Sequence, residues 1–324
     1  MPCGRRQRLP RIQQEAGNIL LLLVDGLGLG ERDANQNPLA VAQTRWFRCF
    51  RTEIPLTDGC SIVSTDASLG VPGLPQSATG HTALLTGLNA PLLAGRHIQG
   101  FCTPTLGALV AKHSLFRTFS LYGGRVAYAN ALTDFTIRRE RFHSVATVAA
   151  RTAGVPLHDL NDLTRGQAVH HDFTNRLLRA RGFSVPLLSP EAAAQRLAAI
   201  AEIHDLTYYE YLQTDLAGHA QDMDRAVRLL EELDRFVSTL VECLDRSRHL
   251  LVLVSDHGNI EDLSTARHTY NRVPAMVWGR GKEYFARRIH ALTDIAASLR
   301  TLWDTGMQRS AARERRPETG DPRP

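Results

Sequence analysis

The sequence lacks the patterns of a disulfide-stabilised protein, a thiolate zinc site and a membrane protein. It has only five cysteines in 324 residues, and no two of them form a CxxC pair. We therefore expect neither a disulfide framework nor cysteine-bound zinc. The apolar run at 19–24 is far shorter than the ~20 residues of a membrane span, and no small-residue cleavage pattern of a signal peptide follows it. We expect a cytoplasmic protein without a membrane partner.

A concentrated basic surface is also missing. The formal net charge of +5 and the pI of about 9.1 come mainly from arginine, including the ends at 1–17 and 307–324, which we predict to be disordered tails. Without these tails little basic excess remains, and it is not gathered with aromatic residues on one module. The sequence therefore predicts no nucleic-acid partner, and it carries no signal for an oligomeric state.

Short apolar runs that lead to acidic residues are present instead. They are "NILLLLVDGLGLG" at 18–30, "LTYYEYLQTD" at 206–215 and "HLLVLVSDHGN" at 249–259. Such runs are typical of strands that are buried on both faces of a parallel sheet. The predicted strands deliver Asp25, Asp215 and Asp256. Because ligands of open α/β sheets bind outside the carboxyl ends of the strands, the three aspartates predict one shared site.

Amphipathic helices are predicted between the strands, at 190–204 and 223–244. Alternating strands and helices favour an α/β fold with a doubly wound, mostly parallel sheet that is flanked by helices. We assign 18–102 and 191–306 to this metal-binding core. Residues 103–190 have weaker apolar runs and several turn signals, so we predict that they form a smaller inserted α+β cap domain.

Histidines accompany the aspartates at the predicted site. His219 follows Asp215 by one helical turn, His257 follows Asp256 directly, and His268 comes soon after. Each residue alone has a simpler explanation, as a helix cap or a hydrogen-bonded structural histidine. Together the aspartates and histidines supply oxygen and nitrogen ligands for two divalent metal ions, with manganese favoured and zinc or magnesium as alternatives.

The stretch "GLPQSATGHTALLTG" at 73–87 combines a serine and a histidine with the start of an apolar segment. Ser77 precedes residues that can form the first turn of a helix, where free N–H groups favour an anion. Ser77 alone could be an N-cap residue, and with His81 it could form a hydrolase pair. Beside two metal ions, we interpret Ser77 as a metal-activated nucleophile.

Five motifs in this order resemble the metal-dependent branch of the alkaline phosphatase superfamily, closest to cofactor-independent phosphoglycerate mutase and phosphopentomutase. They are "LLVDGLGLG", "GLPQSATGHTALLTG", "TDLAGHAQD", "SDHGNIED" and "ARHTYNRVP". The resemblance implies two sets of metal ligands: Asp25, Ser77, Asp256 and His257 for one ion, and Asp215, His219 and His268 for the other. It also implies that Ser77 is phosphorylated in a covalent intermediate. We expect His81, Asn259 and Glu261 to support this site without binding metal.

The resemblance covers the core on both sides of residues 103–190 and does not supply the residues that hold the substrate. Arginines of the predicted cap are candidates for binding a substrate phosphate, although most arginines in such a segment are solvated. The candidates are Arg125, Arg138, Arg139, Arg141 and Arg165.

Together these observations predict a two-metal phosphoryl-transfer enzyme that acts on a small phosphorylated metabolite. It would be a phosphomutase if the cap retains the dephosphorylated product and a phosphatase if water enters. Two alternatives remain: a phosphodiesterase or phosphonate hydrolase with the same site, and a catalytically silent protein that binds a metal or a metabolite. A sulfatase is disfavoured because the C/S-x-P-x-R motif is missing at the serine.

Overall fold

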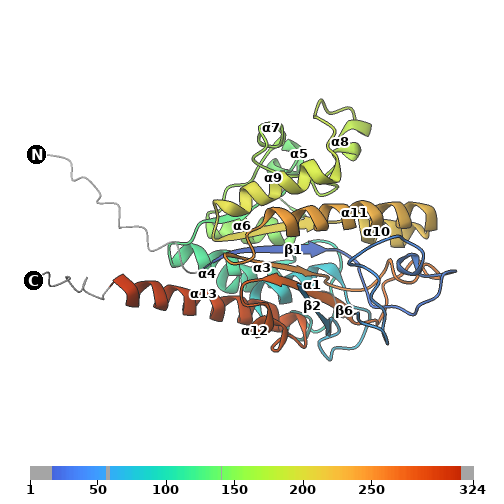
Figure 1. Cartoon of the computed structure of the whole chain (residues 1–324), viewed down its shortest axis with the longest axis horizontal. Coiled ribbons are helices and arrows are strands. Elements are labelled where there is room, and N and C mark those ends of the chain that lie inside the picture. The colour runs from blue at the N-terminus through green and yellow to red at the C-terminus, as the bar shows by residue number, and fades with distance from the viewer. Residues whose placement is uncertain (1–16, 56–58, 140, 315–324) are drawn as a thin grey trace, which may run out of the picture.

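One six-stranded sheet forms the centre of the molecule (Figure 1). The computed structural model describes residues 17–55, 59–139 and 141–314. The strand order across the sheet is β2-β6-β5-β1-β4-β3. The strands are β1 (Asn18–Val24), β2 (Cys60–Thr65), β3 (Val126–Tyr128), β4 (Leu206–Tyr211), β5 (His249–Val254) and β6 (Val273–Gly279).

The sheet is mostly parallel. Strands β5, β1, β4 and β3 run in one direction, and β6 is antiparallel to both of its neighbours, β5 and β2. At the centre of the sheet, Leu21 of β1 lies opposite Tyr208 of β4 and Val252 of β5. All residues of these three strands are buried, as expected where helices cover both faces. The predicted doubly wound, mostly parallel α/β fold is confirmed.

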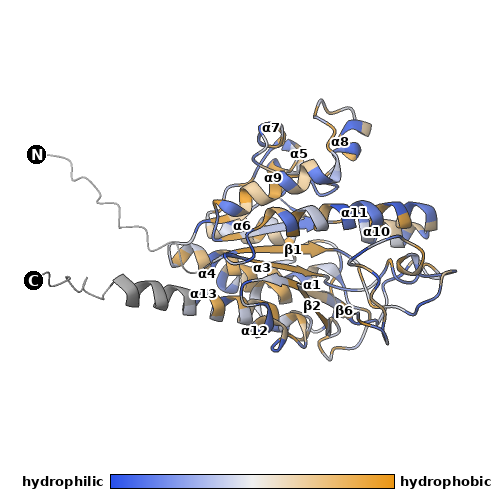
Figure 2. Cartoon of the chain, in the orientation of Figure 1, coloured by the Kyte–Doolittle hydropathy of each residue, from blue (hydrophilic) through white to orange (hydrophobic). Residues whose placement is uncertain are grey.

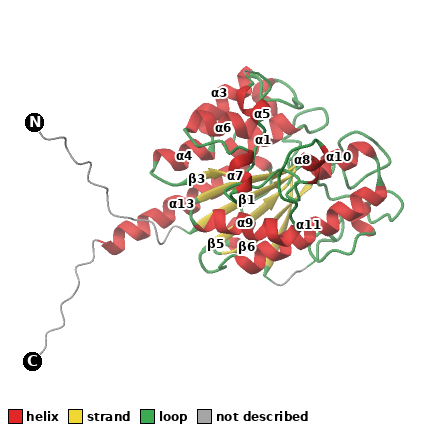
Figure 3. Cartoon of the chain, turned by 90° about the horizontal axis from the view of Figure 1, so that it is seen from above, coloured by secondary structure: helices red, strands yellow, loops and turns green. Residues whose placement is uncertain are grey.

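Helices cover the sheet in two layers, which Figure 3 shows from above. The layer on one face contains η1 (Pro38–Ala40), α9 (Pro190–Glu202), α10 (Gln213–Ala220) and α11 (Met223–Cys243). The layer on the other face contains α1 (Ser77–Thr86), α2 (Ala90–Ala94), α3 (Pro104–His113), α4 (Leu115–Leu121), α6 (Val145–Ala153), α12 (Lys282–Ala286) and α13 (Leu292–Glu314). In Figure 2 the strand β1 is apolar, whereas α11 carries many hydrophilic residues.

The helices α11 and α1 are buried in different ways. Helix α11 is amphipathic, with Leu230, Leu233 and Val237 buried at helical spacing. Helix α1 is buried along nearly its whole length, and threonine hydroxyls in it form hydrogen bonds with backbone carbonyls of the same helix. Thr82 and Thr86 each donate to the carbonyl oxygen four residues earlier, at 2.7 and 2.6 Å. Helix α1 can therefore lie fully inside the core, next to the carboxyl edge of the sheet.

Residues 103–190, which we predicted to be a cap, divide into two parts. Helices α3, α4 and α6 pack into the core, and β3 is an edge strand of the central sheet. In contrast, α5 (Asp134–Arg138), α7 (Leu160–Thr164) and α8 (Arg176–Ala180) lie beyond α9 in Figure 1. A small separate apolar cluster underlies this second part: Ala131, Leu163, Ala168, Leu178 and Val185. A cap that acts as one domain over 103–190 stays a prediction.

The predicted strand at 206–215 is shorter than expected. β4 ends at Tyr211 and α10 begins at Gln213, so Asp215 lies in the first turn of a helix and not at a strand end. The helix has a clear consequence for the site, because Asp215 and His219 are four residues apart and share one face of α10.

The predicted terminal tails fall largely outside the described residues, which exclude 1–16 and 315–324. Helix α13 continues to Glu314 and so includes residues 307–314 of the predicted C-terminal tail. Within the described part of the chain, no helix has the length and apolarity to cross a bilayer.

Candidate metal centre

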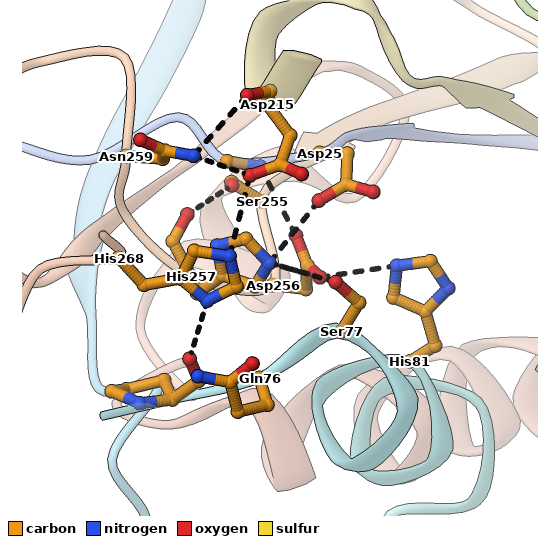
Figure 4. Close-up of polar contacts among 12 residues, drawn as sticks. Asp25, Gln76, Ser77, His81, Asp215, Ser255, Asp256, His257, Asn259 and His268 are labelled. Atoms are coloured by element: carbon orange, nitrogen blue, oxygen red, sulfur yellow. Dashed lines mark hydrogen bonds and ion pairs between the residues drawn. The ribbon is translucent and has the colours of Figure 1, made fainter. Parts of the chain in front are cut away.

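All seven predicted metal ligands come together at the carboxyl edge of the sheet (Figure 4). They belong to the loops after β1 and β5, the start of α1, helix α10 and the loop before β6. We call one set the buried cluster: Asp25, Ser77, Asp256 and His257. We call the other set the cavity cluster: Asp215, His219 and His268.

In the buried cluster, three oxygen atoms surround one nitrogen. His257 Nε2 lies 2.9 Å from Ser77 Oγ. It also lies 3.2 Å from Asp25 Oδ1 and 3.2 Å from Asp256 Oδ2. An imidazole nitrogen carries one proton or one lone pair, so it cannot form good hydrogen bonds with all three oxygens. Such a gathering of oxygen and nitrogen donors suits a divalent transition metal.

In the cavity cluster, backbone contacts fix the orientation of both histidines. The Nδ1 atoms of His219 and His268 donate to the carbonyl oxygens of Ala266 and Pro75, at 2.7 and 2.8 Å. The Nε2 atoms of both rings therefore face the site, and they lie only 3.3 Å apart. Asp215 places a carboxylate oxygen 3.3 Å from the Nε2 of His219 and another 3.4 Å from that of His268. One ligand atom each from Asp215, His219 and His268 thus converges on one point, as around a bound cation.

The two clusters adjoin each other and fit two divalent ions. The rings of His257 and His268 stack with their centroids 3.7 Å apart. Asp25 Oδ1 and Asp256 Oδ2 are buried and face histidine nitrogens without an aligned hydrogen bond in the described chain, as expected for oxygens that bind a metal. Three triads of ligand atoms are close enough to hold an ion: Asp215, His219 and His268; Asp25, Asp215 and His257; and Asp25, His81 and Asp256.

Charges in the buried cluster shift one another's pKa values. Burial, and then the charges of Asp256 and Asp215, raise the pKa of Asp25 to about 7. Burial lowers the pKa of His257, but the charges of Asp256 and Asp25 outweigh it and raise this pKa to about 10. Burial also opposes ionisation of Asp256, yet His257 and His81 hold the pKa of Asp256 below its usual value. A metal ion must therefore displace protons from this cluster.

His81 links the centre to a second buried carboxylate. Its Nε2 lies 3.1 Å from Asp256 Oδ2, and its Nδ1 lies 3.2 Å from Glu210 Oε1. Burial opposes the charged ring, but the two carboxylates raise the pKa of His81 well above its usual value. Glu210 also accepts hydrogen bonds from the hydroxyls of Tyr128 and Tyr208, at 2.9 and 3.1 Å. Both ring nitrogens of His81 thus face protein carboxylates, and this geometry favours a supporting role for His81.

Asn259 and Glu261 hold the loops of the site in place. Asn259 Nδ2 donates to Asp215 Oδ1 at 2.6 Å. Glu261 Oε2 accepts from the backbone N–H groups of Gly28 and Asn259, at 2.9 and 2.7 Å. A Cβ atom at Gly28 would lie 2.1 Å from Glu261, so the loop after β1 can approach this carboxylate only with glycine there. Glu261 thus ties the loops after β1 and β5 together.

Ser77 is the first residue of α1 and not its N-cap, which is Gln76. The Ser77 hydroxyl is therefore not used to cap the helix, and it faces His257. One turn further on, a Cβ atom at Gly80 would lie 2.9 Å from the Cβ of Asp256. The missing side chain at Gly80 lets α1 reach the loop after β5, with its amino end at the site.

Three of the arginines predicted to bind substrate are not near the metal ligands. Arg125 precedes β3 and pairs with Asp205, at 3.4 Å. Because β3 runs parallel to β4, Arg125 lies at the amino edge of the sheet, opposite the site. Arg138 and Arg165 are exposed and pair with acidic residues one turn away in their own segments. The structure does not bring these three arginines to the metal ligands, because the direction of β3 and the positions of the short helices place them elsewhere, so their substrate-binding role stays a prediction.

A cavity of about 920 Å³ opens onto Ser77 and the cavity cluster. Five further polar residues line it: Gln76, Arg96, His97, Gln99 and Arg267. We did not predict them, although Arg267 directly precedes the proposed ligand His268 in the sequence. The guanidinium groups of Arg96 and Arg267 have no ion pair within 17–55, 59–139 and 141–314. They are free to meet an anionic ligand.

Comparison with known proteins supports the predicted resemblance. The Metalloenzyme superfamily matches residues 186–304, which contain the whole cavity cluster. The 2,3-bisphosphoglycerate-independent phosphoglycerate mutase of Paracoccus denitrificans (strain Pd 1222) is 32% identical over 123 residues, 36% of this chain and 24% of that enzyme. The corresponding enzyme of Ruegeria sp. (strain TM1040) is 32% identical over 121 residues, 35% of this chain and 24% of that enzyme. The chain thus spans about a quarter of the length of these curated relatives.

Solved structures share the fold over most of the chain. The PH0037 protein from Pyrococcus horikoshii superposes with a TM-score of 0.57 at 15% identity, and the match covers 89% of this chain and 97% of that one. The cold-active alkaline phosphatase from Shewanella sp. gives a TM-score of 0.53 at 12% identity, over 88% and 99%. With the family match, this confirms the resemblance to alkaline phosphatase superfamily metalloenzymes, a class of metal-dependent phosphomutases and phosphatases.

Proposed function

We propose that this chain is a two-metal phosphoryl-transfer enzyme that acts on a small phosphorylated metabolite through a phosphoserine at Ser77. The observation that carries the proposal is the position of the Ser77 hydroxyl. It lies 2.9 Å from His257 Nε2, at the amino end of α1 and beside both ligand clusters. A serine hydroxyl is a weak nucleophile at neutral pH, so it needs a neighbouring group or metal that lowers its pKa.

The residues that would hold the two ions are those of the buried cluster and the cavity cluster. Two bound divalent ions lower the pKa of a coordinated hydroxyl and offset the charge of a transferring phosphoryl group. The mixture of carboxylate and imidazole donors suits manganese, with zinc and magnesium as alternatives. His81, Asn259 and Glu261 keep these donors in position through the contacts described above.

The substrate phosphate enters through the 920 Å³ cavity, where Arg96 and Arg267 offer positive charge. The Ser77 Oγ forms a bond to phosphorus while the bond from phosphorus to the leaving oxygen breaks. The Ser77 proton goes to solvent, and the leaving oxygen takes up a proton from solvent. The amino end of α1 presents backbone N–H groups that stabilise the phosphoryl oxygens.

Hydrolysis is the outcome that we favour for the phosphoserine. Arg96, Gln99, Gly100 and Arg267 line the cavity and are exposed, so water can reach Ser77 from the mouth. A phosphomutase would need this mouth to close over the dephosphorylated product. Release of inorganic phosphate therefore marks the favoured outcome, and positional isomerisation without phosphate release marks the mutase.

The test is incubation of manganese-loaded protein with phosphorylated sugars, phosphoglycerates and an aryl phosphate, followed by mass spectrometry of the Ser77 peptide. We expect a phosphorylated Ser77, and a loss of activity of at least about 10³-fold in Ser77→Ala. Ser264→Ala is the matched control, because Ser264 is exposed and bonds to Asp262 away from the ligands. Unmodified Ser77 together with full activity of Ser77→Ala would contradict the proposal.

A further inference from the structure

A second cavity of about 700 Å³ adjoins the catalytic one and differs from it in chemistry. Gln99 lines both cavities, and the chain passes from the first to the second within residues 96–104. The second cavity is mainly apolar, and the residues that line it include Phe101, Pro104, Phe142 and Val148. A polar cavity at the metal ligands thus continues into an apolar one.

Two aromatic rings dominate this second cavity and are open to solvent. Phe101 is 47% exposed and Phe142 is 65% exposed, although large apolar side chains are normally buried. The rings meet edge to face, with their centroids 5.6 Å apart. The guanidinium of Arg139 lies over the Phe101 ring, 5.0 Å from its centroid. Two of the predicted substrate-binding arginines are therefore close to these rings: Arg141 lines the second cavity, and Arg139 adjoins it through Phe101.

The backbone holds Phe142 in an unfavourable conformation. Its φ is +62°, in the left-handed region that bulky side chains rarely adopt. Such conformations persist where the surrounding structure fixes a side chain for use, for example at ligand sites. The aromatic pair is thus a fixed, exposed surface beside a site for an anion.

We propose that the second cavity binds the leaving group of the substrate, and that the substrate is a phosphate ester that carries a flat aromatic or heteroaromatic ring. The inference rests on the proposed function, because Ser77 and the metal ligands define the position of the phosphate. The ring packs on Phe101 and Phe142, and Arg139 and Arg141 face its polar edge or a further negative charge. A phosphoglycerate has no group for this cavity, whereas an aromatic ester fills both.

Binding of unreactive phosphonates tests the inference without turnover. Manganese-loaded protein is titrated by calorimetry with phenylalkylphosphonates of increasing linker length, and with alkylphosphonates of the same chain lengths. We expect at least one phenyl compound to bind roughly tenfold more tightly than its alkyl counterpart, since aromatic packing adds to area burial. Phe101→Ala and Phe142→Ala should reduce this preference to about threefold or less, and Phe101→Tyr should keep it.

Phe135→Ala is the control, because Phe135 is exposed on α5 and lines neither cavity. If phenyl and alkyl phosphonates bind equally well to the unchanged protein, the inference is overturned and the proposed function stands. If none of them binds, both are overturned. A dimer in solution that dissociates in Phe142→Ala would assign the aromatic pair to a contact between two copies and would also overturn the inference.

Discussion

The two ligand clusters lie side by side but differ in their contact with solvent. In the buried cluster the side chains of His257 and Asp256 are 0% exposed, whereas in the cavity cluster His219 is 43% exposed. Protein charges compensate the buried cluster, since His81 and His257 flank Asp256. The cavity cluster instead relies on backbone carbonyls that orient its two histidines. The buried cluster thus keeps its charged groups out of solvent by pairing them with one another. The cavity cluster keeps the Nε2 atoms of its histidines directed at the cavity.

Removal of the central charge of the buried cluster should have the largest effect. Asp256→Asn leaves His81 and His257 without their shared carboxylate, and loss of one partner of a buried ion pair costs roughly 3–5 kcal/mol. We expect the metal-free variant to be destabilised by about this amount in urea, and the metal-loaded variant to be inactive.

Asp245→Asn is the control for this substitution, because Asp245 lies in the loop before β5, where its side chain bonds to Ser247. Equal stability of the Asp256→Asn and Asp245→Asn variants would show that the buried charges are not coupled as described.

Loss of a ligand from the cavity cluster should remove one ion and leave the other. His219→Ala takes one of three donors from that cluster and none from the buried cluster. We expect metal analysis to find two manganese ions per chain before the substitution and one after it, with activity reduced at least about tenfold. His204→Ala is the control, since His204 bonds to the carbonyl of Ile200 at the end of α9. If the His219→Ala variant still holds two ions, His219 is not a metal ligand.

The pH dependence of metal binding should come from the buried cluster. The pKa of His257 is raised to about 10 and that of Asp25 to about 7, so a metal ion displaces protons from both below pH 7 and from His257 above it. We expect the affinity for manganese to rise about tenfold or more per pH unit from pH 6 to 8. If His257 had an ordinary pKa, the affinity for manganese would instead stop rising above about pH 7.5. The same rise of affinity with pH should persist in His219→Ala. An affinity that does not change with pH in this variant would show that the pH dependence does not come from the buried cluster.

We expect the smallest effect on activity from substitutions of arginines. Their effects should differ between an arginine of the cavity and one of the predicted cap. Arg267 lines the catalytic cavity, whereas Arg138 pairs with Asp134 on the surface of α5. We expect Arg267→Ala to lower kcat/KM by about tenfold, mainly through KM, since a charge-assisted hydrogen bond contributes roughly 1.5–3 kcal/mol. Arg138→Ala should stay within about twofold. Equal effects in steady-state kinetics would restore the cap arginines as candidates.

The ligands were predictable because each lies next to a strong local signal. Asp25 and Asp256 follow continuous apolar runs, and such runs become buried strands almost regardless of context. For Asp215 the predicted element is wrong: it was expected at a strand end and lies in the first turn of α10. A helix there was harder to foresee, because the polar sequence from Gln213 to Ala220 has little apolar periodicity.

The polar residues that line the cavity at Ser77 were mostly missed because no local pattern marks them. Arg125 and Arg267 look alike in the sequence, yet one lies at the amino edge of the sheet and the other lines the catalytic cavity. The difference arises from the direction of β3, a strand of three residues, and from the fold of the loop before β6. A strand this short has too few residues for its apolar pattern to be recognised.

The sequence by itself determined three strands at the centre of the sheet, the acidic and histidine residues near their carboxyl ends and the serine at a helix start, since hydrophobic periodicity and the order of the motifs encode these locally. Tertiary structure alone decided the rest. It brought Ser77 and His257 together across 180 positions of the chain, turned both Nδ1 atoms of the cavity histidines toward carbonyls, and placed Phe101 and Phe142 beside the catalytic cavity. Such contacts depend on how distant segments pack, which no short stretch of sequence specifies.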